Sequence, residues 1–248
     1  MKNVIFIAAI LFAFSFWGHA EPSTKIVFLD SKNGVEVGYS KNPESSNRHI
    51  QIEVRKNGKQ IQTIDYQYPD EFFDDATEKI ERHVEFVDLN FDGFKDVRIF
   101  LGQYGNQDVA YWQFFIWNAK NSSFEFCDSQ KIPNPEPNPK EKCITSFIRE
   151  HAAYHHYYIY RFDGGKLKLA SHLHEVTSLD LAKIYGSKIP EDEDAGEFML
   201  KTFDLPLSLY DSVLYVEEQF SGKNRTISKP SLTPTRQFCN AFGWDEAR

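Results

Sequence analysis

The sequence predicts a mainly β protein built from antiparallel hairpins, with little helix. Short runs of alternating apolar and polar residues, separated by turn residues, fill most of the chain. Phe, Tyr and Trp make up 15% of the residues, and aromatic side chains favour strands. The regular spacing of the runs suits a propeller-like or sandwich arrangement.

Residues 1–20 have the pattern of a secretory signal peptide. Lys2 precedes an apolar run from Val4 to Trp17, and Gly18 and Ala20 are small residues three and one before the expected cut. The run is short for a membrane span. We therefore expect a periplasmic or secreted protein without stable membrane insertion, whose single mainly β domain covers residues 21–248.

Two hairpins are predicted from their turns. Asn-Gly and Gly-Gly pairs supply the positive φ angles of tight turns. Between the hairpins, the run 110–117 is apolar on both faces, which indicates a central strand. The predicted hairpins comprise 50–55 with 60–64 around Asn57-Gly58, and 157–162 with 166–170 around Asp163-Gly164-Gly165.

Helix is expected at one place. Residues 178–185 could form about two turns that end at Gly186. The acidic run 191–194 is expected to be a solvated loop, and 221–236 a loosely held segment around Pro230 and Pro234.

The stretch from Asp88 to Asp96 predicts a calcium-binding loop. Asp88, Asn90 and Asp92 fill alternate positions before Gly93, in the pattern D-x-[DN]-x-[DN]-G. The carbonyl of Phe94 and the carboxylate of Asp96 would complete the ligand set, since calcium takes six to eight oxygen ligands.

The flanks of this loop differ from those of an EF-hand. Position twelve is Ile99 instead of Glu, and β-branched and aromatic runs at 84–87 and 97–101 indicate a strand-loop-strand site. The alternative is an ordinary turn without a metal, because Asp, Asn and Gly dominate turns for local reasons.

Three cysteines follow the signal peptide. Cys127 and Cys143 flank a proline-rich segment and are predicted to form a disulfide. Cys239 is left as a buried thiol or as a competing partner, because spacing alone does not fix connectivity.

Histidines are concentrated near the second hairpin. His172 and His174 would share one strand face, so a zinc site would need a third ligand from His151, His155 or His156. The alternative is an aromatic strand whose polar tips face solvent. Sequence alone leaves both open.

The order of these features resembles a family of calcium-binding periplasmic proteins. The resemblance covers about residues 80–170 and includes the loop from Asp88 to Asp96, the aromatic strand 111–117 and the segment 132–135. This family includes the immunity protein of the xanthomonad antibacterial type IV secretion system, which inhibits a lysozyme-like effector. The resemblance implies a structural calcium and a mainly β fold, and no inhibitory loop carries over residue by residue.

These observations favour a binding protein over an enzyme. The formal net charge of −8 argues against nucleic acid and suits a basic protein partner. No nucleophile-elbow, zincin or phosphate-loop motif is present. We expect an inhibitor or immunity factor against a peptidoglycan-degrading enzyme, with Asn134 and Glu136 in the partner loop 131–142. The alternative is a glycan-binding or hydrolytic cell-envelope protein.

Overall fold

The computed structural model describes residues 25–30, 34–41, 49–67, 83–105, 107 and 109–244. The predicted signal peptide at residues 1–20 lies outside these ranges. The described chain forms three antiparallel sheets and a few short helices, so the predicted mainly β fold class is confirmed. Among the described helices, none has both the length and the apolar character needed to cross a membrane.

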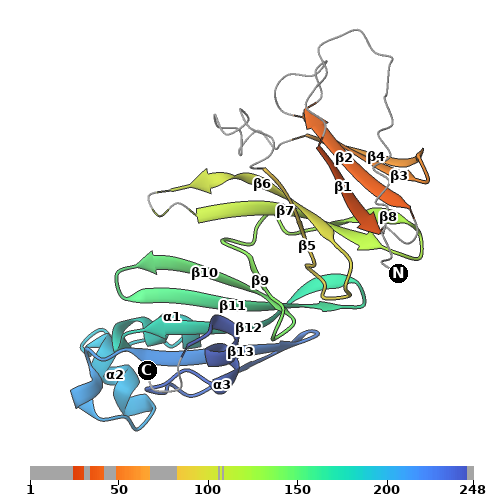
Figure 1. Cartoon of the computed structure of the whole chain (residues 1–248). Helices are drawn as coiled ribbons and strands as arrows, with labels where there is room; N and C mark the ends of the chain where they lie inside the picture. Colours follow the sequence, from red (N-terminus) through yellow and green to blue (C-terminus); the bar gives the residue numbers. More distant parts are fainter. Residues whose placement is uncertain are drawn as a thin grey trace, which may run out of the picture.

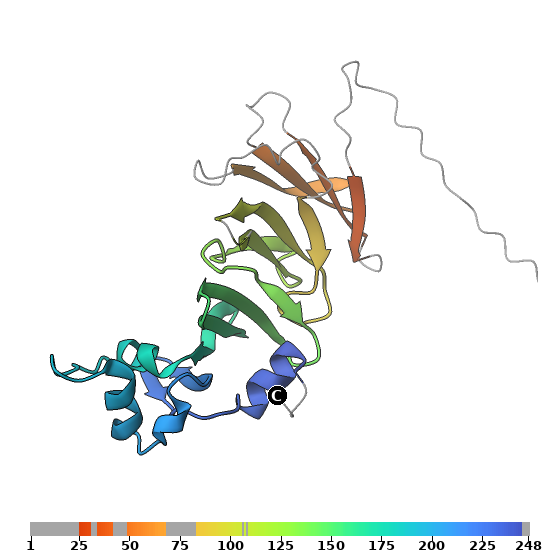
Figure 2. The same cartoon turned by 90° about the vertical axis from the view of Figure 1, so that its left-hand side faces the viewer.

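The three sheets stack as successive layers in chain order (Figure 1). We call them the first, middle and third sheets. Within each sheet, strands that follow one another in the sequence are also neighbours in space. Figures 1 and 2 show an open row of layers, so the packing resembles a sandwich and no propeller closure is formed by the described residues.

The first sheet is a four-stranded meander. The predicted hairpin turn is confirmed, because Asn57 and Gly58 have φ angles of 51° and 76° between the last two strands. Its strands are β1 (Lys25–Asp30), β2 (Val35–Lys41), β3 (His49–Lys56) and β4 (Lys59–Gln67).

The middle sheet contains the predicted central strand. It consists of β5 (Val84–Val87), β6 (Asp96–Tyr104), β7 (Val109–Asn118) and β8 (Ser123–Cys127). Phe115 and Trp117 of β7 pack against the first sheet, whereas Trp112 and Phe114 pack toward the third. Apolar residues on both faces of this strand follow from layers on both sides.

The third sheet has six strands. Gly164 and Gly165 have φ angles of 57° and 76° in the turn between β11 and β12, which confirms the second predicted hairpin. A β-bulge interrupts this pair between Ile159 and Tyr160 of β11. The strands are β9 (Glu136–Asn138), β10 (Cys143–His151), β11 (Tyr154–Asp163), β12 (Lys166–Val176), β13 (Leu214–Ser221) and β14 (Asn224–Ile227).

Short helices cover the third sheet. The 3-10 turn η4 (Ser178–Asp180) and α1 (Leu181–Tyr185) occupy the predicted helical segment, which ends at Gly186 in the left-handed region. Two further helices were not predicted, namely α2 and α3. The segment expected to be loosely held contributes β14, which pairs with β13. The remaining elements are α2 (Ala195–Thr202), η5 (Leu207–Leu209) and α3 (Arg236–Phe242).

Four apolar clusters hold these layers together. One lies between the first and middle sheets, and another joins the middle sheet to Ile144 of the third. The third sheet is covered by α1 and α2 through Tyr154 and Val216, and by α3 through Leu173 and Phe238. Burial of this apolar area is the main favourable contribution to folding.

Candidate functional site

The predicted calcium loop connects β5 to β6 in the middle sheet. Leu89 is fully buried in the cluster that faces the third sheet, so it anchors the base of the loop. Gly93 has a φ angle of 93°, a conformation that side-chain-bearing residues rarely adopt. The predicted strand-loop-strand placement is therefore confirmed.

Three predicted ligands share a compact set of hydrogen bonds. The carboxylate of Asp88 accepts from the backbone N–H groups of Asp92 and Gly93 at 3.1 and 2.9 Å. Asn90 Oδ1 accepts from Asp92 N at 3.1 Å, and its amide donates to Asp92 Oδ2 at 2.9 Å. Asp92 Oδ1 accepts from the N–H of Phe94 at 2.9 Å. These contacts keep three oxygen-bearing side chains on one turn.

Asp96 lies on the inner side of the same loop. It is fully buried, and its Oδ2 accepts from Leu89 N at 2.7 Å and from Asn90 N at 3.3 Å. Its Oδ1 accepts from the N–H of Trp117 in β7 at 2.7 Å. Burial raises the pKa of Asp96 to about 7, although these backbone hydrogen bonds act in the opposite direction. Asp96 thus fastens the loop to the sheet.

The donor chemistry of the loop fits a hard cation. Its side chains offer carboxylate and amide oxygens, the ligands that calcium takes. The oxygens of Asp88, Asp92 and Asp96 do not form a group within 4.8 Å of one another in the described ranges. Convergence on one ion would require the loop to close further, so calcium binding stays a prediction.

The predicted Cys127–Cys143 disulfide is not formed in the structure. Cys127, Cys143 and Cys239 are all buried free thiols. Cys127 ends β8 and packs between the middle and third sheets, whereas Cys143 begins β10 and packs in the cluster that includes α3. Cys127 and Cys143 therefore fill different apolar clusters. Proximity to a shared proline-rich segment did not bring them together.

The predicted partner loop, residues 131–142, is held against two sheets. Asn134 exchanges backbone and side-chain hydrogen bonds with Ala110 of β7, both 2.8 Å long, and donates to the carbonyl of Phe147 in β10 at 2.9 Å. Glu136 lies in edge strand β9, with its Oε2 3.5 Å from Arg98 Nη1. Asn134 is thus half-buried and bonded to two neighbouring strands, while Glu136 is exposed. A recognition role for either stays a prediction.

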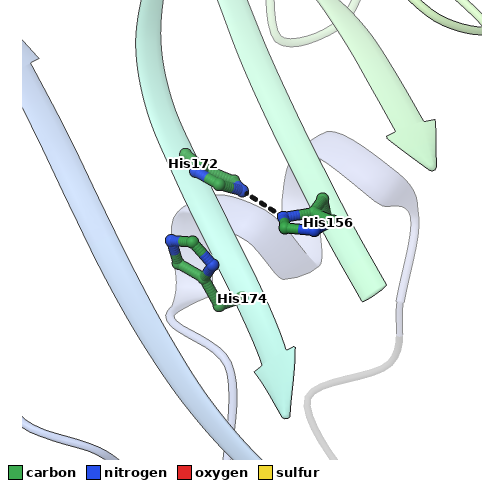
Figure 3. Close-up of side chains that lie close together, drawn as sticks. All are labelled: His156, His172 and His174. Atoms are coloured by element: carbon green, nitrogen blue, oxygen red, sulfur yellow. Dashed lines mark hydrogen bonds between the residues drawn. The ribbon is translucent and has the colours of Figure 1, made fainter. Parts of the chain in front are cut away.

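Three of the predicted histidines meet on one face of the third sheet. His156 of β11 pairs with His174 of β12, and His172 pairs with Tyr158. Figure 3 shows these three imidazole rings turned toward one another across the two strands. Their ligand atoms all lie within 4.8 Å of one another. Among the described residues, no other group of three or more His, Cys, Asp or Glu side chains is this compact.

We call His156, His172 and His174 the histidine cluster. His156 Nδ1 lies 2.9 Å from His172 Nε2, and the ring centroids of His172 and His174 are 3.8 Å apart. The rings of Tyr154 and Tyr158 stack against the cluster, 4.4 Å from His156 and 4.2 Å from His172. Two tyrosine rings therefore line the cluster.

Carboxylates hold the outer nitrogens of the histidine cluster. His156 Nε2 lies 3.0 Å from Glu150 Oε2, and His174 Nε2 lies 2.7 Å from Glu218 Oε1. The second nitrogen of His174, Nδ1, is 2.8 Å from the Tyr154 hydroxyl. Both outer carboxylates carry a cation on their other side, because Lys183 contacts Glu150 and Arg225 contacts Glu218.

The surroundings favour the neutral form of the three imidazoles. Burial lowers the pKa of His172 to about 2, helped by repulsion from the other two rings and Arg225. Burial also lowers the pKa values of His156 and His174, although their carboxylate partners act in the opposite direction. Neutral imidazole is the form that binds metals.

The other two candidate histidines lie apart from the cluster. His155 is on the opposite face of β11, where its Nδ1 contacts Glu175 Oε1 at 2.8 Å. His151 lies at the end of β10, with its Nε2 3.6 Å from Asp180. All five histidines are candidates from the sequence, and in the structure His156 is the third member of the group.

Comparisons with known proteins give one distant likeness of fold. No protein-family model and no curated protein sequence matches this chain. A solved structure described as a Xanthomonas type IV secretion system related protein is similar, with a TM-score of 0.46 and 16% identity. The match covers 84% of this chain and 99% of that one. A likeness at this level concerns the arrangement of the fold and carries no functional argument.

Proposed function

We propose that this chain is an exported calcium-binding protein that acts by binding another protein, as an inhibitor or immunity factor against a peptidoglycan-degrading, lysozyme-like enzyme. The observation that carries the proposal is the loop from Asp88 to Asp96, which presents oxygen donors between two adjacent strands. Calcium there would be structural, held by Asp88, Asn90, Asp92, the carbonyl of Phe94 and Asp96.

The inhibitory part of the proposal is supported by the sequence resemblance and by charge. The resemblance to calcium-binding periplasmic proteins that include an inhibitor of a lysozyme-like effector supplies the partner class. A formal net charge of −8 would speed encounter with a basic hydrolase through long-range attraction. Glu136, exposed on the edge strand β9, is the first candidate contact.

An inhibition assay tests the partner class directly. Purified protein is added in excess to lysozyme-like enzymes that digest peptidoglycan, and release of soluble fragments is followed. We expect at least one enzyme to be inhibited with calcium present. Glu136→Gln should weaken inhibition, whereas Glu193→Gln, in an exposed loop after α1, should leave it unchanged. If both variants inhibit equally well, Glu136 in β9 is not a contact with the enzyme.

A glycan-binding role is the second candidate. Phe147 of β10 is 37% exposed, and its ring lies 4.9 Å from that of Tyr157, which in turn is 4.7 Å from Trp244. Exposed aromatic faces can stack on sugar rings. Pull-down from a cell-envelope extract separates the two candidates, because the inhibitor proposal requires recovery of a protein hydrolase and the glycan proposal requires peptidoglycan fragments.

A further inference from the structure

We propose that the histidine cluster, His156, His172 and His174, is a second metal site, which binds a divalent transition ion of the zinc class. This site is separate from the calcium loop, which lies in the middle sheet. The inference rests on the spacing, orientation and surroundings of the three imidazoles, and it holds whether or not the protein inhibits an enzyme.

The spacing of the ring nitrogens is close to that of a zinc site. Zinc binds imidazole nitrogen at about 2.0–2.1 Å in a tetrahedral arrangement, so ligand nitrogens lie about 3.4 Å apart. In the cluster His156 Nδ1 and His172 Nε2 are 2.9 Å apart, and all three ligand atoms lie within 4.8 Å. Small rotations of the rings would therefore bring three nitrogens onto one ion.

The outer hydrogen bonds orient two of the rings for binding. A carboxylate on the far nitrogen of a histidine ligand fixes the tautomer and raises the basicity of the near nitrogen. Glu150 holds His156 in this way, and Glu218 holds His174. The Nδ1 atoms of both rings then face inward, where His156 meets His172 in Figure 3. An incoming ion would displace the Tyr154 hydroxyl from His174 Nδ1.

The ligand chemistry selects the class of ion. Imidazole suits zinc, copper and nickel, whereas calcium and magnesium prefer oxygen. The nearby carboxylates of Glu150 and Glu218 provide negative charge beside a divalent ion, partly offset by Lys183 and Arg225. The side chains of His156 and Glu150 are 12% and 42% exposed, so an ion can enter from that edge.

Zinc titration of the chelator-treated chain, followed by calorimetry in excess CaCl2, tests the proposal. We expect one zinc ion per chain to bind at the cluster. His156→Gln should abolish this binding, and Glu150→Gln should weaken it by about 10–100-fold, as outer partners of metal ligands do. His155→Gln is the matched control, because it changes a histidine on the same strand that faces the other side of the sheet.

A measurement on the unaltered chain guards against variants that fail to fold. In a spectrum of 15N-labelled histidine, zinc should shift the ring nitrogens of three histidines and leave the others in place. Absence of zinc binding by the unaltered chain would overturn the proposal and leave the cluster as a metal-free hydrogen-bond network. The proposal would also be overturned if folded His156→Gln bound zinc as tightly as the unaltered chain, or if His155→Gln lost as much zinc affinity as His156→Gln.

Discussion

Asp96 and Trp117 are joined by a 2.7 Å hydrogen bond from the backbone N–H of Trp117 to the Asp96 carboxylate, across 21 residues of sequence. The other oxygen of Asp96 accepts from Leu89 and Asn90. One buried side chain therefore couples the loop to strand β7. The contribution of this coupling to stability can be measured separately from calcium by working in the presence of a chelator.

Replacing Asp96 by Asn is predicted to destabilise the protein. The new amide puts a donor opposite a backbone N–H and leaves a buried group unsatisfied, which costs about 1–3 kcal/mol. Urea unfolding in the presence of a chelator measures the change. Asp192→Asn, at an exposed position, is the control and should change stability by less than about 0.5 kcal/mol. Equal stability of the two variants would contradict the anchoring role of Asp96.

Calcium is predicted to raise the melting temperature. An ion that binds the folded chain alone stabilises it by about 2.7 kcal/mol at a concentration of 100 times its dissociation constant. Thermal unfolding is compared in excess CaCl2 and in chelator. Asp92→Ala should remove the calcium response, and Asp192→Ala should retain it. If the melting temperature of the unaltered chain is the same in CaCl2 and in chelator, the calcium assignment is wrong.

Local turn chemistry made the two hairpins predictable. Tight hairpin turns require positive φ angles, which Asn and Gly adopt readily, and the turns at Asn57-Gly58 and Gly164-Gly165 both formed where expected. The two missed helices are short and depend on packing against the third sheet. For α2 a signal existed, since Asp194 accepts from the N–H of Glu197 as an N-terminal cap. Asp194 is the last residue of the acidic run, which is expected from the sequence to be a solvated loop, so the cap was missed.

A single β-bulge decided which histidine completes the cluster. From the turn outward, Asp163 pairs with Lys166 and Tyr160 with Leu169. Continued without interruption, this register would place His155 opposite His174. The bulge after Ile159 shifts the pairing by one residue and brings His156 there. Periodicity predicts which residues share a face on one strand, but it does not locate a bulge, so three histidines remained possible from sequence.

The protein is predicted to lose stability at high pH because Tyr66 is buried. It is 8% exposed, and burial raises its pKa to about 12, although a hydrogen bond from Gln130 acts in the opposite direction. A group whose pKa rises on folding contributes stability that is complete below its unfolded pKa, here about 10, and is lost as the pH approaches 12. The loss attributable to Tyr66 is about 2–3 kcal/mol.

Tyr66→Phe should flatten this alkaline decline. Urea unfolding of both proteins at pH values on either side of about 10 gives the slope of stability against pH. At neutral pH the variant should be weaker by about 1 kcal/mol, because the hydrogen bond from Gln130 is lost. Parallel slopes for the two proteins would show that the Tyr66 hydroxyl is not buried.

The thiols are predicted to be free but slow to react. Burial raises the pKa of Cys127 to about 11 and also raises that of Cys143. The reactive thiolate is therefore scarce in the folded chain at neutral pH. Alkylation followed by mass spectrometry should modify three cysteines after denaturation and few before it. If only one thiol reacts in a denatured, unreduced sample, two cysteines are paired and the disulfide prediction is correct.

Arg225 is predicted to stabilise the buried end of the histidine cluster. Its guanidinium makes two hydrogen bonds of 2.7 and 2.6 Å to Glu218, which is 4% exposed and also contacts His174. Burial alone would raise the pKa of Glu218, but hydrogen bonds from Arg225 and His174 outweigh it and lower that pKa. Removing the guanidinium leaves a buried carboxylate with fewer donors, which costs about 1–3 kcal/mol.

Two substitutions separate the charge of Arg225 from its geometry. Arg225→Ala removes both, whereas Arg225→Lys retains the charge and loses the paired hydrogen bonds. We expect urea unfolding to rank the unaltered chain above Arg225→Lys, and Arg225→Lys above Arg225→Ala. Arg225→Lys keeps the positive charge near the ion and loosens Glu218, which orients His174, so this variant should bind zinc more weakly than the unaltered chain. Lower stability with unchanged zinc affinity in Arg225→Lys would confine Arg225 to a structural role.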